Sequence, residues 1–239
     1  MEYDRRILIL DGSRGELQRL ALDLLGRNFS VHYANDPAEA QLLAQEAQGQ
    51  IGAVLVAPSV ELDQIPDMTR RLSVQPSALI PMGARPAERE IAALAFHGVR
   101  WHLWDDPSDE MIRFVLSNVM SQHDPMELRF HPRVPSRVAA TLEIEDQKGD
   151  VTIRDLSLGG ACLLGQVVGE VDARGQLAFA LEDAELRLPV CIAWCVEATG
   201  DAIGVAGIAF TEVGSDEGEA LDRFVRSVIT AQRITAPKP

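Results

Sequence analysis

The chain has 239 residues, with 36 acids against 22 Lys and Arg, and a formal net charge of −14 at pH 7. This acidity argues against nucleic-acid binding, which usually needs an electropositive face, and no apolar run approaches the roughly 20 residues that cross a bilayer. The N-terminal residues lack the apolar core of a signal peptide, so we expect a cytoplasmic protein that is not inserted in a membrane.

The first 122 residues alternate short apolar runs with stretches of helical period. The runs predict strands, because they are short and are bounded by polar residues; they lie at 6–11, 29–33, 53–57, 78–81 and 99–104. Apolar spacing and caps such as Asp36-Pro37 predict the intervening helices, which lie at 17–25, 37–47, 64–72, 87–96 and from 108 onward. Five strand–helix units of this length predict a doubly wound parallel sheet.

The order and lengths of these units resemble a response-regulator receiver domain. Working receivers have a magnesium-binding acidic pair, a phosphate-accepting aspartate, a hydroxyl and a lysine after successive strands. The matching positions here hold Asp11 without a second acid, then Ala57, Gly83 and Asp105-Asp106. Alanine cannot accept a phosphoryl group, and one aspartate is too few ligands for a hard divalent cation. We therefore interpret residues 1–122 as a pseudo-receiver domain.

A second pattern begins after a polar break at residues 121–125, which ends the last helix. From Val138 the apolar period changes to two, and we expect strands at 138–144, 151–155, 161–164, 176–181, 186–196 and 203–210. Six short strands predict a small antiparallel barrel, and a helix from Ser215 should cover it. The expected fold class is α/β plus β: domain 1–122, a linker and arginine segment 123–137, and a barrel domain 138–239.

Three arginines and no acid occupy the nine residues from Arg129 to Arg137. Guanidinium groups gathered in an anionic chain indicate an anionic ligand. Eighteen residues further on, a polar turn runs from Asp155 through Ser157 to Gly160 between apolar runs. Arginine clusters and Asp-x-Ser turns are each common on solvated surfaces, so the prediction of a binding site depends on both occurring together.

The pair of motifs, Arg129-x-x-x-Arg133 and Asp155-x-Ser157-x-x-Gly160, resembles the signature of the PilZ domain, a bacterial receptor module for cyclic diguanylate (c-di-GMP). The resemblance covers roughly the C-terminal half of the chain. It implies that the two motif arginines contact guanine and phosphate, and that the turn residues complete the site.

The chemistry of these residue types suits that ligand. An arginine fork matches the two acceptors on the guanine Hoogsteen edge and also pairs with phosphate oxygens, while a carboxylate accepts from the guanine N1 and N2 hydrogens. Arg137 is expected to add a supporting charge, and His131 either touches phosphate or is solvated. In PilZ domains an arginine before the first motif arginine favours a second stacked ligand, so Leu128 at that position implies one ligand per barrel.

The remaining reactive side chains are scattered. The five histidines show no spacing typical of a nucleophile or a metal site, and Cys162, Cys191 and Cys195 are expected to be reduced and buried. We therefore expect no enzymatic activity, no metal and no cofactor other than the c-di-GMP ligand.

The sequence thus predicts a cytoplasmic, non-enzymatic c-di-GMP receptor whose residues 1–122 serve an unidentified protein partner or self-association. One alternative is a phosphorylation-controlled response regulator, against which the missing acid and Ala57 count. The other is an interaction scaffold that binds no nucleotide.

Overall fold

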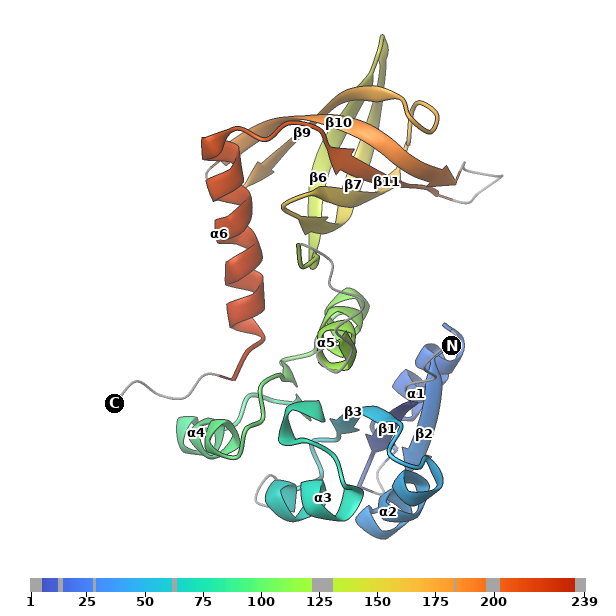
Figure 1. Ribbon diagram of the computed structural model, residues 1–239, viewed down its shortest axis with the longest axis vertical. Coiled ribbons are helices and arrows are strands. Elements are labelled where there is room, and N and C mark those ends of the chain that lie inside the picture. The colour runs from blue at the N-terminus through green and yellow to red at the C-terminus, as the bar shows by residue number, and fades with distance from the viewer. Residues whose placement is uncertain are drawn as a thin grey trace. The chain divides into compact units, whose positions relative to one another are not determined.

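The computed structural model describes residues 6–12, 15–27, 29–61, 64–121, 131–182, 184–196 and 203–234, and it divides into two units (Figure 1). One unit comprises Met1–Leu128 together with Gln232–Pro239, and the other comprises Arg129–Ala231. Within the described part of the chain, no helix combines the length and apolarity that a membrane span requires.

The first unit is built on a five-stranded parallel sheet in the order β2-β1-β3-β4-β5. Its strands are β1 (Arg6–Leu10), β2 (Ser30–Ala34), β3 (Ile51–Val56), β4 (Leu79–Gly83) and β5 (Leu103–Trp104). Its helices are α1 (Gln18–Leu25), α2 (Pro37–Glu46), α3 (Ile65–Leu72), α4 (Glu88–Phe96) and α5 (Asp109–Ser121), with a 3₁₀ turn, η2, at Pro76–Ala78. This strand order is that of flavodoxin-like doubly wound sheets, and it confirms the predicted parallel α/β fold.

Local sequence explains these elements well. Every residue of β3 is buried, as expected for a central parallel strand covered on both faces. Asp36 caps α2 by accepting hydrogen bonds from the backbone N–H groups of Ala38 and Glu39 at 2.8 and 2.9 Å, and Pro37 opens the helix. Gly98, with φ of +87°, follows α4 in the left-handed conformation that ends many helices.

The second unit is a closed antiparallel barrel in the order β10-β11-β8-β7-β6-β9. Its strands are β6 (Val134–Ile144), β7 (Gln147–Ser157), β8 (Gly160–Gly165), β9 (Arg174–Leu181), β10 (Ala184–Val196) and β11 (Gly204–Phe210). Helix α6 (Ser215–Ala231) packs against the barrel core through Ala220 and Leu221, with Phe224 beside them. The predicted six-stranded barrel with a covering helix is confirmed.

The first barrel strand begins at Val134, earlier than the predicted Val138. The pairing of β6 with β7 shifts register between Pro135 and Val138, which marks a β-bulge, and Arg137 within it has a φ of +114°. Ser136 stabilises the bulge by donating its hydroxyl to the Ile153 carbonyl at 2.7 Å. The irregularity hides the two-residue period from sequence inspection, so the expected arginine segment 123–137 overlaps the strand at its end.

Candidate ligand-binding site

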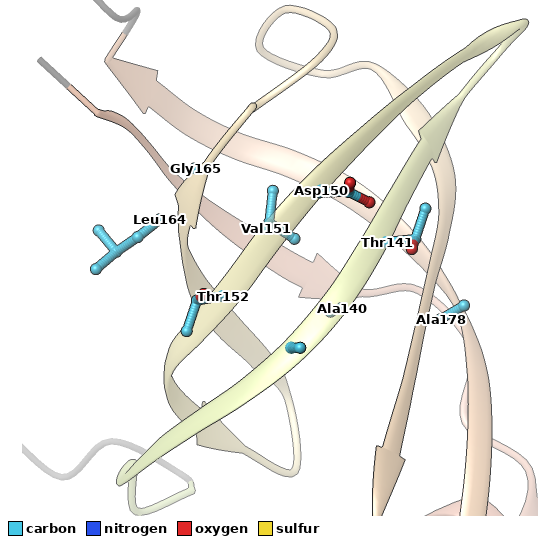
Figure 2. Close-up of a pocket in the computed structure, with 9 residues that line it drawn as sticks. Ala140, Thr141, Asp150, Val151, Thr152, Leu164, Gly165 and Ala178 are labelled. Carbon is cyan, nitrogen blue, oxygen red and sulfur yellow. The ribbon is translucent and has the colours of Figure 1, made fainter. Parts of the chain in front are cut away.

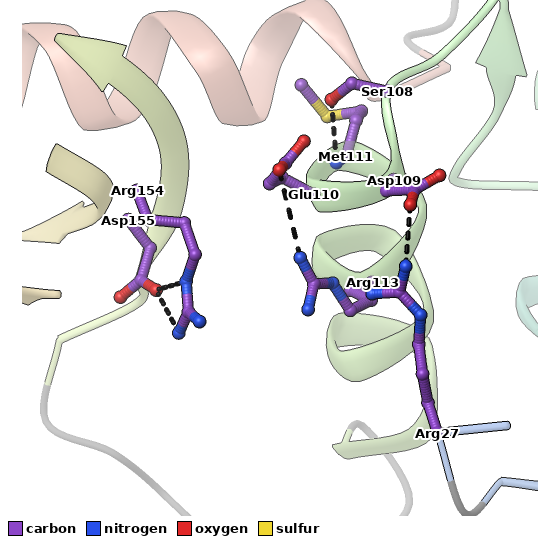
Figure 3. A network of polar contacts seen from close by, with 8 residues as sticks. All are labelled: Arg27, Ser108, Asp109, Glu110, Met111, Arg113, Arg154 and Asp155. Atoms are coloured by element: carbon purple, nitrogen blue, oxygen red, sulfur yellow. Dashed lines mark hydrogen bonds and ion pairs between the residues drawn. The ribbon is translucent and has the colours of Figure 1, made fainter. Parts of the chain in front are cut away.

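Asp155, near the end of β7, lies between two guanidinium groups. Nε and Nη2 of Arg154 both donate to Oδ2 of Asp155 at 3.1 Å (Figure 3). On the other side, Nη1 of Arg133 lies 3.8 Å from Oδ1 of Asp155. The Asp155 side chain is 20% exposed, while Arg133 and Arg154 are 38% and 33% exposed. The cluster therefore offers a carboxylate acceptor and two solvent-accessible cations at one place.

The turn that follows Asp155 is held by the other two motif residues. Ser157 is 5% exposed; its hydroxyl donates to the Gly160 carbonyl at 3.0 Å and accepts from the Gly159 N–H at 3.3 Å. A Cβ on Gly160 would lie 2.1 Å from the backbone oxygen of Ile208 in β11, so only glycine fits without a shift. These two residues shape the turn that follows Asp155.

Of the remaining predicted site residues, the structure describes His131 and Arg137 but not Leu128 and Arg129. His131 is exposed and lies against the turn, since a Cβ on Gly159 would come 3.2 Å from its ring Cδ2. Arg137 is exposed at the β6 bulge. Leu128 and Arg129 fall outside the described residues, so their roles stay predictions.

Trp194 shares a cross-strand row with Asp155. Asp155 pairs with Cys162 of β8, Cys162 pairs with Gly207 of β11, and Gly207 pairs with Trp194 of β10. The indole lies over Gly207, where a Cβ would come 2.1 Å from its Nε1, and the residue is 41% exposed. Sequence reasoning placed Trp194 on a late barrel strand but not near the motif, because the strand order that brings them together is not visible in the sequence.

A surface pocket of about 430 Å³ lies on the outer side of β6, β7, β8 and β9 (Figure 2). Its lining is mostly small side chains, including Ala139, Thr141, Thr152 and Ala178, with Asp150 as the one acid. Thr152 pairs with Ala139 across the two strands and lies three residues before Asp155 on β7. The residues that line this pocket are distinct from the charged cluster of Asp155, Arg133 and Arg154.

In the N-terminal unit, Asp11, the one acid at the position matched to the receiver acidic pair, is fully buried. The backbone N–H of Leu17 donates to Oδ1 of Asp11 at 2.8 Å, and the Tyr33 hydroxyl donates to Oδ2. Desolvation, followed by the hydrogen bond to Asp11 and its negative charge, raises the pKa of Tyr33 to about 12. Both carboxylate oxygens of Asp11 therefore accept a hydrogen bond from within the unit.

The other positions that the sequence comparison matched to receiver residues are Ala57, Gly83 and Asp105. Ala57 is 1% exposed directly after β3. A Cβ on Gly83 would lie 2.5 Å from Cγ of Pro58, so the proline ring fills the space where a side chain after β4 would stand. Oδ1 of Asp105 accepts the backbone N–H of Arg85 at 3.2 Å. Among the residues that the structure describes, no three His, Cys, Asp or Glu side chains gather to hold a metal ion.

Residues 127–227 match the family model of the PilZ domain. No functionally curated protein is significantly similar to the chain. Among solved structures, the Bacillus subtilis inhibitor of motility MotI/DgrA is 11% identical, over 42% of this chain and 51% of that chain, with a TM-score of 0.37. YcgR in complex with c-di-GMP, from Escherichia coli, is 17% identical, over 43% of this chain and 46% of that one, with a TM-score of 0.37.

The chain thus spans about half the length of those two structures. A third similar structure, the Vibrio cholerae chemotaxis protein CheY4, is 16% identical, over 48% of this chain and 97% of that chain, with a TM-score of 0.41. Identities this low do not transfer a ligand or partner. The matched family segment, however, contains all six barrel strands and both motifs, and the sheet order of the first unit is that of CheY. The C-terminal unit is therefore a PilZ domain, and the N-terminal unit is a five-stranded parallel α/β domain that resembles the CheY receiver fold.

Proposed function

We propose that this protein is a c-di-GMP receptor that binds its ligand on the outer face of the PilZ barrel. The observation that carries the proposal is the Asp155 carboxylate held between Arg133 and Arg154 at the end of β7. A base acceptor flanked by cations is what a guanine nucleotide with phosphodiester charges requires. The family match supports the same ligand class.

Binding would exchange partners within the charged cluster. Arg154 occupies one oxygen of Asp155 with two hydrogen bonds. When guanine N1–H and N2–H donate to that carboxylate, Arg154 is released next to the phosphodiester and can pair with its oxygens. Arg133 and Arg129 supply the forks for a guanine Hoogsteen edge and for phosphate. Ser157 and Gly160 act by holding the turn, and His131 lies close enough to it to contact phosphate.

Trp194 extends the proposed site across the barrel. The exposed indole lies in the same cross-strand row as Asp155, with the two strands β8 and β11 between them. An exposed aromatic ring stacks on bases at about 1–3 kcal/mol per base. We assign to Trp194 the stacking surface for a guanine whose polar edge faces the charged cluster.

We further infer that the N-terminal unit works without phosphorylation. Ala57 provides no nucleophile, and the carboxylate of Asp11 is already hydrogen-bonded on both oxygens. The unit instead serves a protein partner or self-association. Its helices carry single exposed apolar side chains, with Phe96 86% exposed on α4 and Leu22 and Leu42 64% and 62% exposed on α1 and α2.

Tryptophan fluorescence tests the location of the site. Of the three tryptophans, Trp101 and Trp104 are 1% and 8% exposed and belong to the N-terminal unit, whereas Trp194 is 41% exposed on the barrel. We expect c-di-GMP to change the emission of the wild-type chain and of a Trp104→Phe control, but not of Trp194→Phe. An unchanged response in Trp194→Phe would contradict the stacking role. Absence of any calorimetric binding to the wild-type chain would favour the scaffold that binds no nucleotide.

A further inference from the structure

The β5 side of the N-terminal sheet is extended by the three residues that follow α6. The backbone N–H of Ile234 donates to the Arg100 carbonyl at 2.9 Å, and the N–H of His102 donates to the Gln232 carbonyl at 3.3 Å. Between these bonds, Trp101 and Arg233 form an antiparallel bridge. Residues 232–234 therefore pair as a short strand with residues 100–102, directly before β5 at the end of the sheet order.

The side chains of this segment alternate between two environments, as in a strand. Ile234 is 3% exposed and belongs to the same buried cluster as Leu94 and Val99. Cζ of Arg233 instead lies 5.2 Å from the ring centroid of Trp101, which is a cation–π geometry. The segment is thus held by two backbone hydrogen bonds, one buried aliphatic side chain and one guanidinium on an indole.

The segment that pairs with residues 100–102 directly follows helix α6 in the sequence. Helix α6 belongs to the PilZ unit, where Leu221 and Val225 are buried, and it ends at Ala231. The Gln232 carbonyl, which directly follows α6, accepts the backbone N–H of His102 in the N-terminal unit. The pairing segment thus follows α6 directly in the sequence.

We propose that residues 99–104 form a peptide-binding site that takes an extended segment with an Arg-Ile pair, filled by the chain's own residues 232–234. Sheet edges accept added strands through main-chain hydrogen bonds, and side-chain contacts give the selectivity. Here Trp101 selects the cation, and the apolar cluster around Leu94 and Val99 selects the aliphatic residue. The proposal goes beyond nucleotide binding, because the site lies in the N-terminal unit and needs no ligand on the barrel. A partner that adds a strand at this edge would have to displace the chain's own C-terminal segment.

Two truncations of the full chain test this proposal by hydrogen exchange of the His102 amide. A variant that ends at Ala231 should lose the protection of this amide by at least about tenfold, because its acceptor on Gln232 is gone. The matched control, which ends at Ile234, keeps the pairing residues and should exchange like the wild type. Equal protection in both truncations would overturn the proposal.

A synthetic peptide of residues 231–239 provides the second arm. It should bind the variant that ends at Ala231 and restore the protection of the His102 amide, but it should not bind the wild-type chain, whose site is filled. Peptides with Arg233→Ala or Ile234→Ser should bind at least about tenfold more weakly. Equal binding of all three peptides, or no binding to a folded truncated variant, would contradict the site.

If the shorter truncation does not fold, as judged by circular dichroism, the full-length variants Arg233→Ala and Ile234→Ser decide the matter. Each should raise exchange at His102 without changing exchange in the barrel strands, whereas the exposed helix position Thr230→Ala should raise neither. Unchanged exchange at His102 in both variants would overturn the proposal.

Discussion

Replacing Asp155 by alanine removes the proposed acceptor for the guanine N–H groups and should weaken c-di-GMP binding about 30-fold. Hydrogen bonds to a charged group contribute about 1.5–3 kcal/mol, so the loss of the base contacts costs about 3 kcal/mol. The free variant, however, no longer holds Arg133 and Arg154 in ion pairs that binding must break. These pairs are partly exposed and are worth at most about 1 kcal/mol together. The net loss is therefore about 2 kcal/mol, which corresponds to the 30-fold change.

Isothermal titration calorimetry at fixed ionic strength measures this effect. The matched control is Asp150→Ala, which removes an exposed carboxylate from the same strand at the lining of the neighbouring pocket. The control should bind within about threefold of the wild type, because no base contact is assigned to Asp150. Wild-type affinity in Asp155→Ala, or an equal loss in both variants, would refute the assignment of the guanine acceptor.

Arg133→Ala should weaken c-di-GMP binding by about 1.5–3 kcal/mol, because it removes a charge-assisted pair of hydrogen bonds to the ligand. A wild-type affinity of this variant, measured by calorimetry, would count against the assigned role of Arg133. Titration should saturate at one ligand per chain, and Leu128→Arg should raise that ratio if stacking on a preceding guanidinium recruits a second ligand. Mass spectrometry after incubation with acetyl phosphate and magnesium should find no phosphoryl adduct on residues 1–122. Because the pKa of Tyr33 is raised to about 12 from its ordinary value of 10.0, its contribution to stability is complete below pH 10 and is lost toward pH 12. Tyr33→Phe should therefore show a weaker loss of stability over that range in denaturant titrations.

The elements that sequence predicted best are those with a regular period and a local cap. Asp36-Pro37 marks the start of α2 because its hydrogen bonds are made within three residues, and the apolar run of β3 reports burial on both faces. The start of β6 was missed because the bulge at Arg137 interrupts the alternation on which a strand prediction depends.

Of the proposed site, the sequence predicted the residues in and next to the two motifs, but not Arg154 or Trp194. Asp155, Ser157 and Gly160 lie within six residues of one another, so the sequence alone predicts that they share a turn. Arg154 was overlooked because its interaction with Asp155 depends on the backbone geometry of β7, and Trp194 was overlooked because its position depends on strand order. The pairing of residues 232–234 with residues 100–102 was equally out of reach, since three residues carry no periodic signal and their partner is distant in the chain.

The central claim is most directly tested by calorimetric titration of the full-length chain with c-di-GMP, using guanosine monophosphate and cyclic di-AMP as comparators. We predict saturable binding at micromolar affinity or tighter, which is about −8 kcal/mol or more favourable. Guanosine monophosphate should bind far more weakly, because it presents one base where two are expected to be held, and cyclic di-AMP lacks the N1 and N2 hydrogens that Asp155 would accept. No saturable binding of c-di-GMP, or equal affinity for the comparators, would contradict the proposed receptor function.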